Sequence, residues 1–144
     1  LARDGHPFWP FWENIRSWWA LRDLPNVLML HFDALKRDLP GSIRRIAAFL
    51  AIPIDESKFP AIVEHCSFAY MKANATKSVP LGGAFWDGGA QTFVHKGVNG
   101  RWRDTLTVAD ADRYEAKARA ELGVECAEWL ATGSQPALSS ERLV

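Results

Sequence analysis

The tripeptide His95-Lys96-Gly97 places a cation beside a residue that has no side chain, within a glycine-rich stretch. A lysine can balance the charge of an anion, and a glycine lets an anion come close to the backbone. Gly100 and Trp102 follow at short spacing. By themselves these residues favour a lysine that only faces solvent, and an anion-binding loop is the alternative that they permit.

Other kinds of site chemistry have less support in the sequence. Cys66 and Cys126 match no zinc spacing and no disulfide framework, so we expect two reduced thiols. His31 and His65 are isolated on apolar segments, where core or surface histidines are the simpler interpretation. Because metal binding needs clustered ligands, we expect no metal site.

Composition narrows the classes of partner. The 144 residues suffice for one domain with a real core, and 17 basic residues balance 17 acidic ones. This balance argues against a nucleic-acid partner, which requires a basic face, although it permits a small polyanion. We expect no membrane span, because no apolar run approaches about 20 residues. No signal-peptide pattern is present, so a cytoplasmic location is the default expectation.

The apolar run Val27 to Phe32 is typical of a strand buried on both faces. It is the one clear strand that the sequence predicts. A lone strand cannot satisfy its backbone groups, so its neighbours must come from a longer chain or from a second copy. The first residue is Leu1 rather than Met, which also suggests a fragment. An exchanged strand would make a homo-oligomer.

The rest of the chain is predicted to be mostly helical. Asp38 with Pro40 marks one helix start, and Thr107 with Asp110 resembles a capping box that has Asp in place of the usual Glu. A long glycine-rich loop is expected over residues 74–98. The predicted helices cover residues 8–22, 38–50, 55–66, 107–122 and 125–131, with a further turn over 67–71.

Four segments, in this order, resemble the second half of the cytosolic sulfotransferases and their bacterial relatives. The last is the most specific, because it is similar to the family's Arg-Lys-Gly, Gly-x-Trp and Thr-Val signature. The segments are WENIRSWW (12–19), VLMLHFDALKRDL (27–39), HCSFAYMKAN (65–74) and FVHKGVNGRWRDTLTVADADRY (93–114).

This resemblance implies an α/β fold, the C-terminal portion of a P-loop-kinase-like parallel sheet with helices on both faces. It also implies transfer of a sulfuryl group from 3′-phosphoadenosine 5′-phosphosulfate (PAPS) to a hydroxyl or amine of a small-molecule acceptor. The expected domain covers residues 1–133, with the N-terminal P-loop half missing, and residues 134–144 are expected to form a disordered tail.

The resemblance also assigns roles to residues. Phe68 falls on the aromatic that stacks on adenine, and His95 to Gly97 fall on the segment that binds the 3′-phosphate of PAPS or of the product adenosine 3′,5′-bisphosphate. Stacking of this kind contributes about 1–3 kcal/mol. The residues implied to bind the cofactor are Phe32, Ser67, Phe68, Met71, His95, Lys96 and Gly97.

Two features depart from the family pattern. His95 replaces an arginine, and a histidine cannot make the paired hydrogen bonds of a guanidinium. The G-x-x-x-x-G-K-[ST] motif and the family's catalytic histidine are also absent. We therefore expect no catalytic residue in this segment and no turnover by it alone, because sulfuryl transfer depends on charge stabilisation along the reaction path.

A different function is a helical protein-interaction module with a tryptophan-rich face. Trp12, Trp18 and Trp19 could form such a face, although packing between helices is their simpler role. Residues 103–112 begin a capped helix and also resemble the family's dimer-contact motif, which would give a homo-oligomer.

Overall fold

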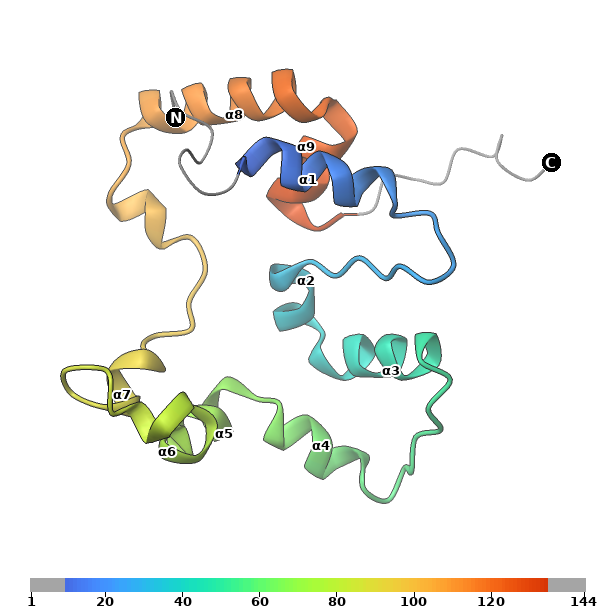
Figure 1. Cartoon of the computed structure of the whole chain (residues 1–144), viewed down its shortest axis with the longest axis vertical. Helices are drawn as coiled ribbons and strands as arrows, with labels where there is room; N and C mark the ends of the chain where they lie inside the picture. The colour runs from blue at the N-terminus through green and yellow to red at the C-terminus, as the bar shows by residue number, and fades with distance from the viewer. Residues whose placement is uncertain (1–9, 135–144) are drawn as a thin grey trace. The chain divides into compact units, whose positions relative to one another are not determined.

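The computed structural model describes residues 10–134, which form two compact units. The first unit contains residues 10–36 and 102–134, and the second contains Arg37–Arg101. The helices of both are labelled in Figure 1. The α-helices are α1 (Phe11–Ala20), α2 (Phe32–Arg37), α3 (Leu39–Phe49), α4 (Phe59–His65), α5 (Phe68–Ala73), α6 (Ala75–Ser78), α7 (Ala90–Phe93), α8 (Val108–Leu122) and α9 (Val124–Thr132), and the 3-10 helices are η1 (Pro80–Gly83) and η2 (Arg101–Asp104).

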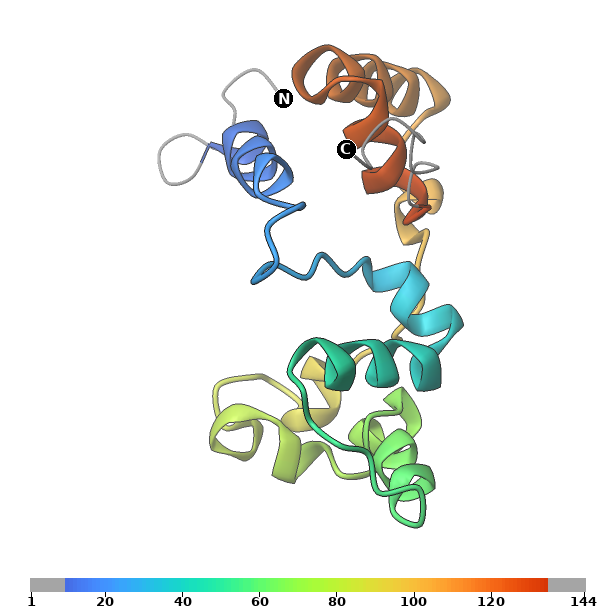
Figure 2. The ribbon, with the colours of Figure 1, turned by 90° about the vertical axis from the view of Figure 1, so that its right-hand side faces the viewer.

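The first unit is built around the indole of Trp12. Trp12 is 2% exposed and forms one buried cluster with Ala118 of α8 and Ala127 of α9. The two alanines leave room for the large ring between the helices, and α8 and α9 pack against each other (Figure 2). Burying an aromatic side chain removes roughly 200 Å² from water, which is about 5 kcal/mol of transfer free energy.

Arg16 ties α1 to the end of α8. Its guanidinium donates hydrogen bonds to the carboxylate of Glu121 at 2.9 Å and to the backbone oxygen of the same residue at 3.1 Å. Hydrogen bonds from Lys117 and Arg16 lower the pKa of Glu121. The carbonyl at a helix end lacks an intrahelical partner, so the arginine serves both a carboxylate and an unsatisfied backbone group.

A buried thiol lies in the same unit. Cys126 of α9 is 1% exposed, and burial raises the pKa of its thiol. Cys66, in the second unit, is exposed. Neither cysteine forms a disulfide in the structure, and the reduced state of the two thiols stays a prediction.

The second unit begins with a capped helix, as the sequence predicts. The Asp38 carboxylate accepts a hydrogen bond from the Gly41 N–H at 2.9 Å, and Pro40 lies in the first turn of α3. Arg44 of α3 then donates two hydrogen bonds, 2.6 and 2.7 Å long, to the carboxylate of Glu56. The Arg44 guanidinium also lies 3.9 Å from the ring centroid of buried Phe59, so α3 and the start of α4 are held together.

The prediction of a strand over Val27 to Phe32 is wrong. Residues 27–31 carry no regular secondary structure, and α2 begins at Phe32. A strand exists only where a neighbouring chain segment pairs with it, and within residues 10–134 no such segment is present. The His31 side chain provides a different anchor, because its Nε2 donates to the Leu130 carbonyl at 3.0 Å.

The consequences for the predicted fold are direct. The parallel sheet is not seen in the described part of the chain, which is helical. The argument for an oligomer formed by strand exchange therefore loses its premise.

The prediction of one long loop over residues 74–98 is also wrong. That stretch contains α6, η1 and α7, which pack around Ala75, Val79 and Ala90. Small residues allow these short turns to approach closely, and several glycines with positive φ allow the sharp reversals between them. Composition alone resembles that of a loop, because the turns are too short to show helical periodicity.

Other boundaries agree closely with the sequence. Helix α1 runs from Phe11 to Ala20, inside the predicted 8–22, while residues 8 and 9 lie outside the described range. Helices α3, α5, α8 and α9 begin within one residue of the predicted starts. The helix predicted from Asp55 is also present, but α4 begins only at Phe59, with Lys58 at its N-cap. The predicted disordered tail lies outside the described residues except for Ser134. Within residues 10–134, no helix has the length and apolar character needed to cross a bilayer.

The start of α8 confirms the predicted capping box. The Thr107 hydroxyl accepts a hydrogen bond from the Asp110 N–H at 3.2 Å, and the Asp110 carboxylate accepts one from the Thr107 N–H at 3.3 Å. Hydrogen bonds from Thr107 lower the pKa of Asp110. This cap fixes where α8 begins and therefore where its face meets α1 and α9.

Thr107→Ala is expected to lower the free energy of unfolding by about 1 kcal/mol, because the Asp110 N–H loses its acceptor and the Asp110 carboxylate loses the hydrogen bond from the Thr107 hydroxyl. Urea denaturation followed by circular dichroism measures this loss. Thr105→Ala is the matched control, since Thr105 is exposed and lies two residues before the cap. Equal midpoints for the two variants would contradict a stabilising role for the cap.

Candidate functional site

The first side of the candidate site is the start of α5. Ser67 caps this helix, its hydroxyl accepting a hydrogen bond from the Tyr70 N–H at 3.1 Å. Phe68 is the first helical residue and is half-buried, while Met71, one turn later, is 39% exposed. The ring of Tyr70 stacks on His65 with centroids 4.3 Å apart, which fixes the junction of α4 and α5.

The second side is the loop that follows α7. Its first turns are closed by backbone hydrogen bonds from Val94 to Ala90 and from His95 to Phe93, each 3.0 Å long. Gly97 then adopts a positive φ of 61°. His95, Lys96 and Gly97 are all exposed, so the loop presents its cation to solvent.

Gly97 and Phe68 bring the two sides together. A Cβ built on Gly97 would lie 2.5 Å from two carbon atoms of the Phe68 ring, which is far inside van der Waals contact. The backbone of the loop therefore lies directly against the aromatic ring. The sequence segments 67–71 and 95–97, distant along the chain, converge in the structure, and both belong to the Arg37–Arg101 unit.

Two polar residues hold this convergence in place. The Lys72 ammonium donates to the His95 carbonyl at 2.9 Å, and it lies 5.9 Å from the centroid of Phe68. The Gln91 side-chain amide donates to the Lys72 carbonyl at 3.1 Å. Figure 1 shows the short helices α5, α6 and α7 gathered in one part of this unit.

The sequence analysis missed Lys72 and Gln91. A signal existed for Lys72, because a residue four positions after Phe68 lies on the same side of a helix. Gln91 had no signal, since α7 was predicted to be loop. Phe32, by contrast, was predicted and belongs to the other unit, where it begins α2 and is 66% exposed. Its place in a shared site stays a prediction.

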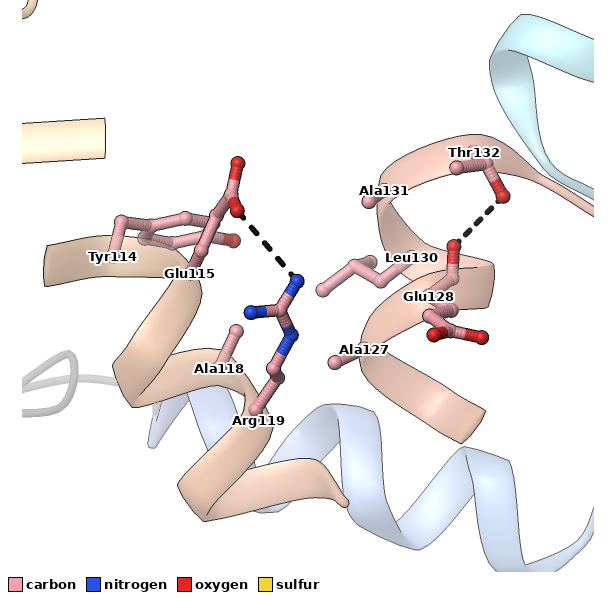
Figure 3. Close-up of a pocket in the computed structure, with 9 residues that line it drawn as sticks. All are labelled: Tyr114, Glu115, Ala118, Arg119, Ala127, Glu128, Leu130, Ala131 and Thr132. Atoms are coloured by element: carbon pink, nitrogen blue, oxygen red, sulfur yellow. Dashed lines mark hydrogen bonds and ion pairs between the residues drawn. The ribbon is translucent and has the colours of Figure 1, made fainter. Parts of the chain in front are cut away.

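The first unit contains a cavity that differs from the candidate site in its lining residues (Figure 3). It lies between α8 and α9 with a volume of about 190 Å³, and none of the seven predicted residues lines it. Ala118 of α8 and Ala127 of α9 line it, and Arg119 forms an ion pair with Glu115 of the same helix at 3.8 Å. Glu115, Glu128 and Arg119 line the cavity, so its charged side chains carry no net positive charge that would attract a phosphate.

The tryptophans give little support to an interaction face. Trp12 is buried, and Trp19 packs against Trp129 with ring centroids 5.3 Å apart. Trp18 differs, because it is 52% exposed. Two of the three rings of α1 are thus used in packing the first unit.

The fold of the chain resembles that of a sulfotransferase of known structure. The crystal structure of mouse sulfotransferase SULT7A1 complexed with PAP matches with a TM-score of 0.67 and 23% sequence identity, covering 86% of this chain and 46% of that protein. At this identity the match concerns the fold.

Sequence comparison identifies the family. The sulfotransferase domain family matches residues 5–124, and the chain belongs to the sulfotransferase family. Sulfotransferase 2B1 of Mus musculus is 31% identical over 124 residues, which are 85% of this chain and 37% of that protein. Sulfotransferase 1C2 of Homo sapiens is 29% identical over 121 residues, 83% of this chain and 41% of that protein. The chain therefore spans less than half the length of these relatives.

Gly97→Ala is expected to loosen the contact with Phe68, because the added Cβ has no room beside the ring. Gly82→Ala is the matched control, since Gly82 also has a positive φ, of 62°, but its Cβ would meet ordinary contact distances. Both variants lose about 1–2 kcal/mol through the left-handed backbone conformation. Only Gly97→Ala should accelerate amide hydrogen exchange at residues 94–97, and equal exchange in both would contradict the contact.

Proposed function

We propose that this chain provides the adenine and 3′-phosphate contacts of a PAPS-dependent sulfotransferase domain. The contact between the Gly97 backbone and the Phe68 ring carries this proposal, because it places an aromatic surface beside an exposed cationic loop. Membership of the sulfotransferase family and the fold shared with a PAP-complexed relative support it.

The residues present fit an adenosine that carries a 3′-phosphate. An adenine ring needs a flat apolar surface, and Phe68 is half-buried, so part of its ring remains accessible for stacking. A phosphate needs a cation and close approach to the backbone, and Lys96 with Gly97 supplies both. Met71, one turn along α5 from Phe68, would extend the apolar surface beside the base.

In the proposed reaction PAPS supplies the sulfuryl group: the bond from sulfur to the 5′-phosphate oxygen breaks, a bond to the acceptor oxygen or nitrogen forms, and the acceptor loses a proton. The chain's own residues bind and orient the nucleotide. Holding the adenine and the 3′-phosphate at fixed points restricts the 5′ end to one position, which is the entropic part of catalysis. We propose no catalytic acid or base within this chain, and the acceptor is a small molecule of unassigned structure.

Phe68→Ala is expected to weaken binding of adenosine 3′,5′-bisphosphate by about 5- to 150-fold, which corresponds to the 1–3 kcal/mol of one stacked base. Isothermal titration calorimetry on the 144-residue chain measures the change. Phe85→Ala is the matched control, because Phe85 lies in the same unit, is 75% exposed and has no predicted role. Unchanged affinity in Phe68→Ala would rule out stacking on this ring.

Lys96→Ala is expected to weaken binding of adenosine 3′,5′-bisphosphate by about tenfold. Binding of adenosine 5′-monophosphate, which lacks the 3′-phosphate, should stay nearly unchanged. The increase in melting temperature with each nucleotide reports this difference. Lys77→Ala, at another exposed lysine of the same unit, provides the control. If the wild-type chain shows no shift with the bisphosphate, the proposed function is wrong.

A further inference from the structure

Lys72 makes two hydrogen bonds to the segment after α6, one through its side chain and one through its backbone carbonyl. Its ammonium donates to the His95 carbonyl at 2.9 Å, and its own carbonyl accepts from the Gln91 side chain at 3.1 Å. The two hydrogen bonds connect α5 to α7 and to the loop beyond it. The side chain of Lys72 thus contacts the loop, while its backbone contacts α7.

The first of these bonds sets the orientation of a peptide group. In a trans peptide the C=O and the following N–H point in opposite directions. Because the His95 carbonyl points at the Lys72 ammonium, the N–H of Lys96 points away from it. Within residues 10–134 that N–H has no hydrogen-bond acceptor, and Lys96 is exposed.

The same ammonium also contributes charge to the site. It lies 5.9 Å from the centroid of Phe68, the ring against which Gly97 packs. Position 95 carries a histidine where the resemblance to sulfotransferases implies an arginine. The ammonium of Lys72 therefore places a cation beside a loop whose own residue 95 lacks the guanidinium.

We propose that Lys72 is the positioning residue of the anion loop: by holding the His95 carbonyl, it turns the Lys96 N–H outward as a donor to the 3′-phosphate. This inference rests on the proposed function. It assigns Lys72 a role in orienting a donor, distinct from the apolar role of Phe68 and from the side-chain charge of Lys96.

The test compares Lys72→Met, which keeps the length of the side chain but loses the donor, with Lys72→Arg, which can still donate to the carbonyl. Lys77→Met is the control for loss of a lysine in this unit. Affinities of the 144-residue chain for adenosine 3′,5′-bisphosphate and adenosine 5′-monophosphate are measured by calorimetry. We expect Lys72→Met to weaken binding of the bisphosphate by about 3- to 10-fold and to leave binding of the monophosphate nearly unchanged. Lys72→Arg should bind the bisphosphate nearly as well as the wild-type chain does.

A measurement without nucleotide separates positioning from direct contact. Loss of a hydrogen bond to the His95 oxygen moves the resonance of the His95 carbonyl carbon, so NMR of the ligand-free chain should show a shift in Lys72→Met and its reversal in Lys72→Arg. An unmoved resonance would overturn the positioning role even if Lys72→Met weakened binding.

The remaining outcomes are also decisive. Equal weakening of both nucleotides by Lys72→Met would show a general loss of structure and overturn the inference. If the wild-type chain binds the bisphosphate and Lys72→Met binds it equally well, the inference about Lys72 is wrong and the proposed function still stands. A wild-type chain that binds neither nucleotide would overturn both.

Discussion

The packing of a backbone segment on an aromatic ring couples two positions that are far apart in the chain. Any side chain at position 97 would have to displace either the loop or the ring of Phe68, so neither residue can change independently. Glycine also tolerates the positive φ that brings the loop back toward α5. The contact thus fixes the backbone at position 97 against the aromatic ring.

The helices around this contact cannot be stable through their own hydrogen bonds. Helices α5, α6 and α7 have six, four and four residues, well below the roughly 12–15 at which isolated helices become stable. They are held instead by a cap at Ser67, by the small-residue cluster around Ala75 and by the Gln91 amide. These short helices therefore depend on tertiary contacts for their stability, and polar side chains make several of those contacts.

The sequence predicted those parts of the structure that depend on neighbouring residues. The caps at Asp38 and Thr107 are local, since each side chain bonds a backbone group within three residues, and both are confirmed. The strand at 27–32 depended on a distant partner, and a continuous apolar run cannot distinguish a buried strand from an extended connection. At the candidate site, Phe68 and Gly97 were found through family resemblance. Lys72 was missed although its spacing from Phe68 placed it on the same side of α5, because its bond to the His95 carbonyl depends on a fold that brings distant segments together.

The difference in exposure between the two cysteines provides a way to measure local opening of the first unit. Cys66 is exposed and open to alkylating reagents in the folded state, whereas Cys126 is buried next to Ala127 of the Trp12 cluster and burial raises the pKa of its thiol. Alkylation of Cys126 then requires the helices of its unit to separate briefly, at a rate governed by the local opening equilibrium. The rate of Cys126 alkylation, relative to that of Cys66, therefore measures how often the helices around Trp12 open.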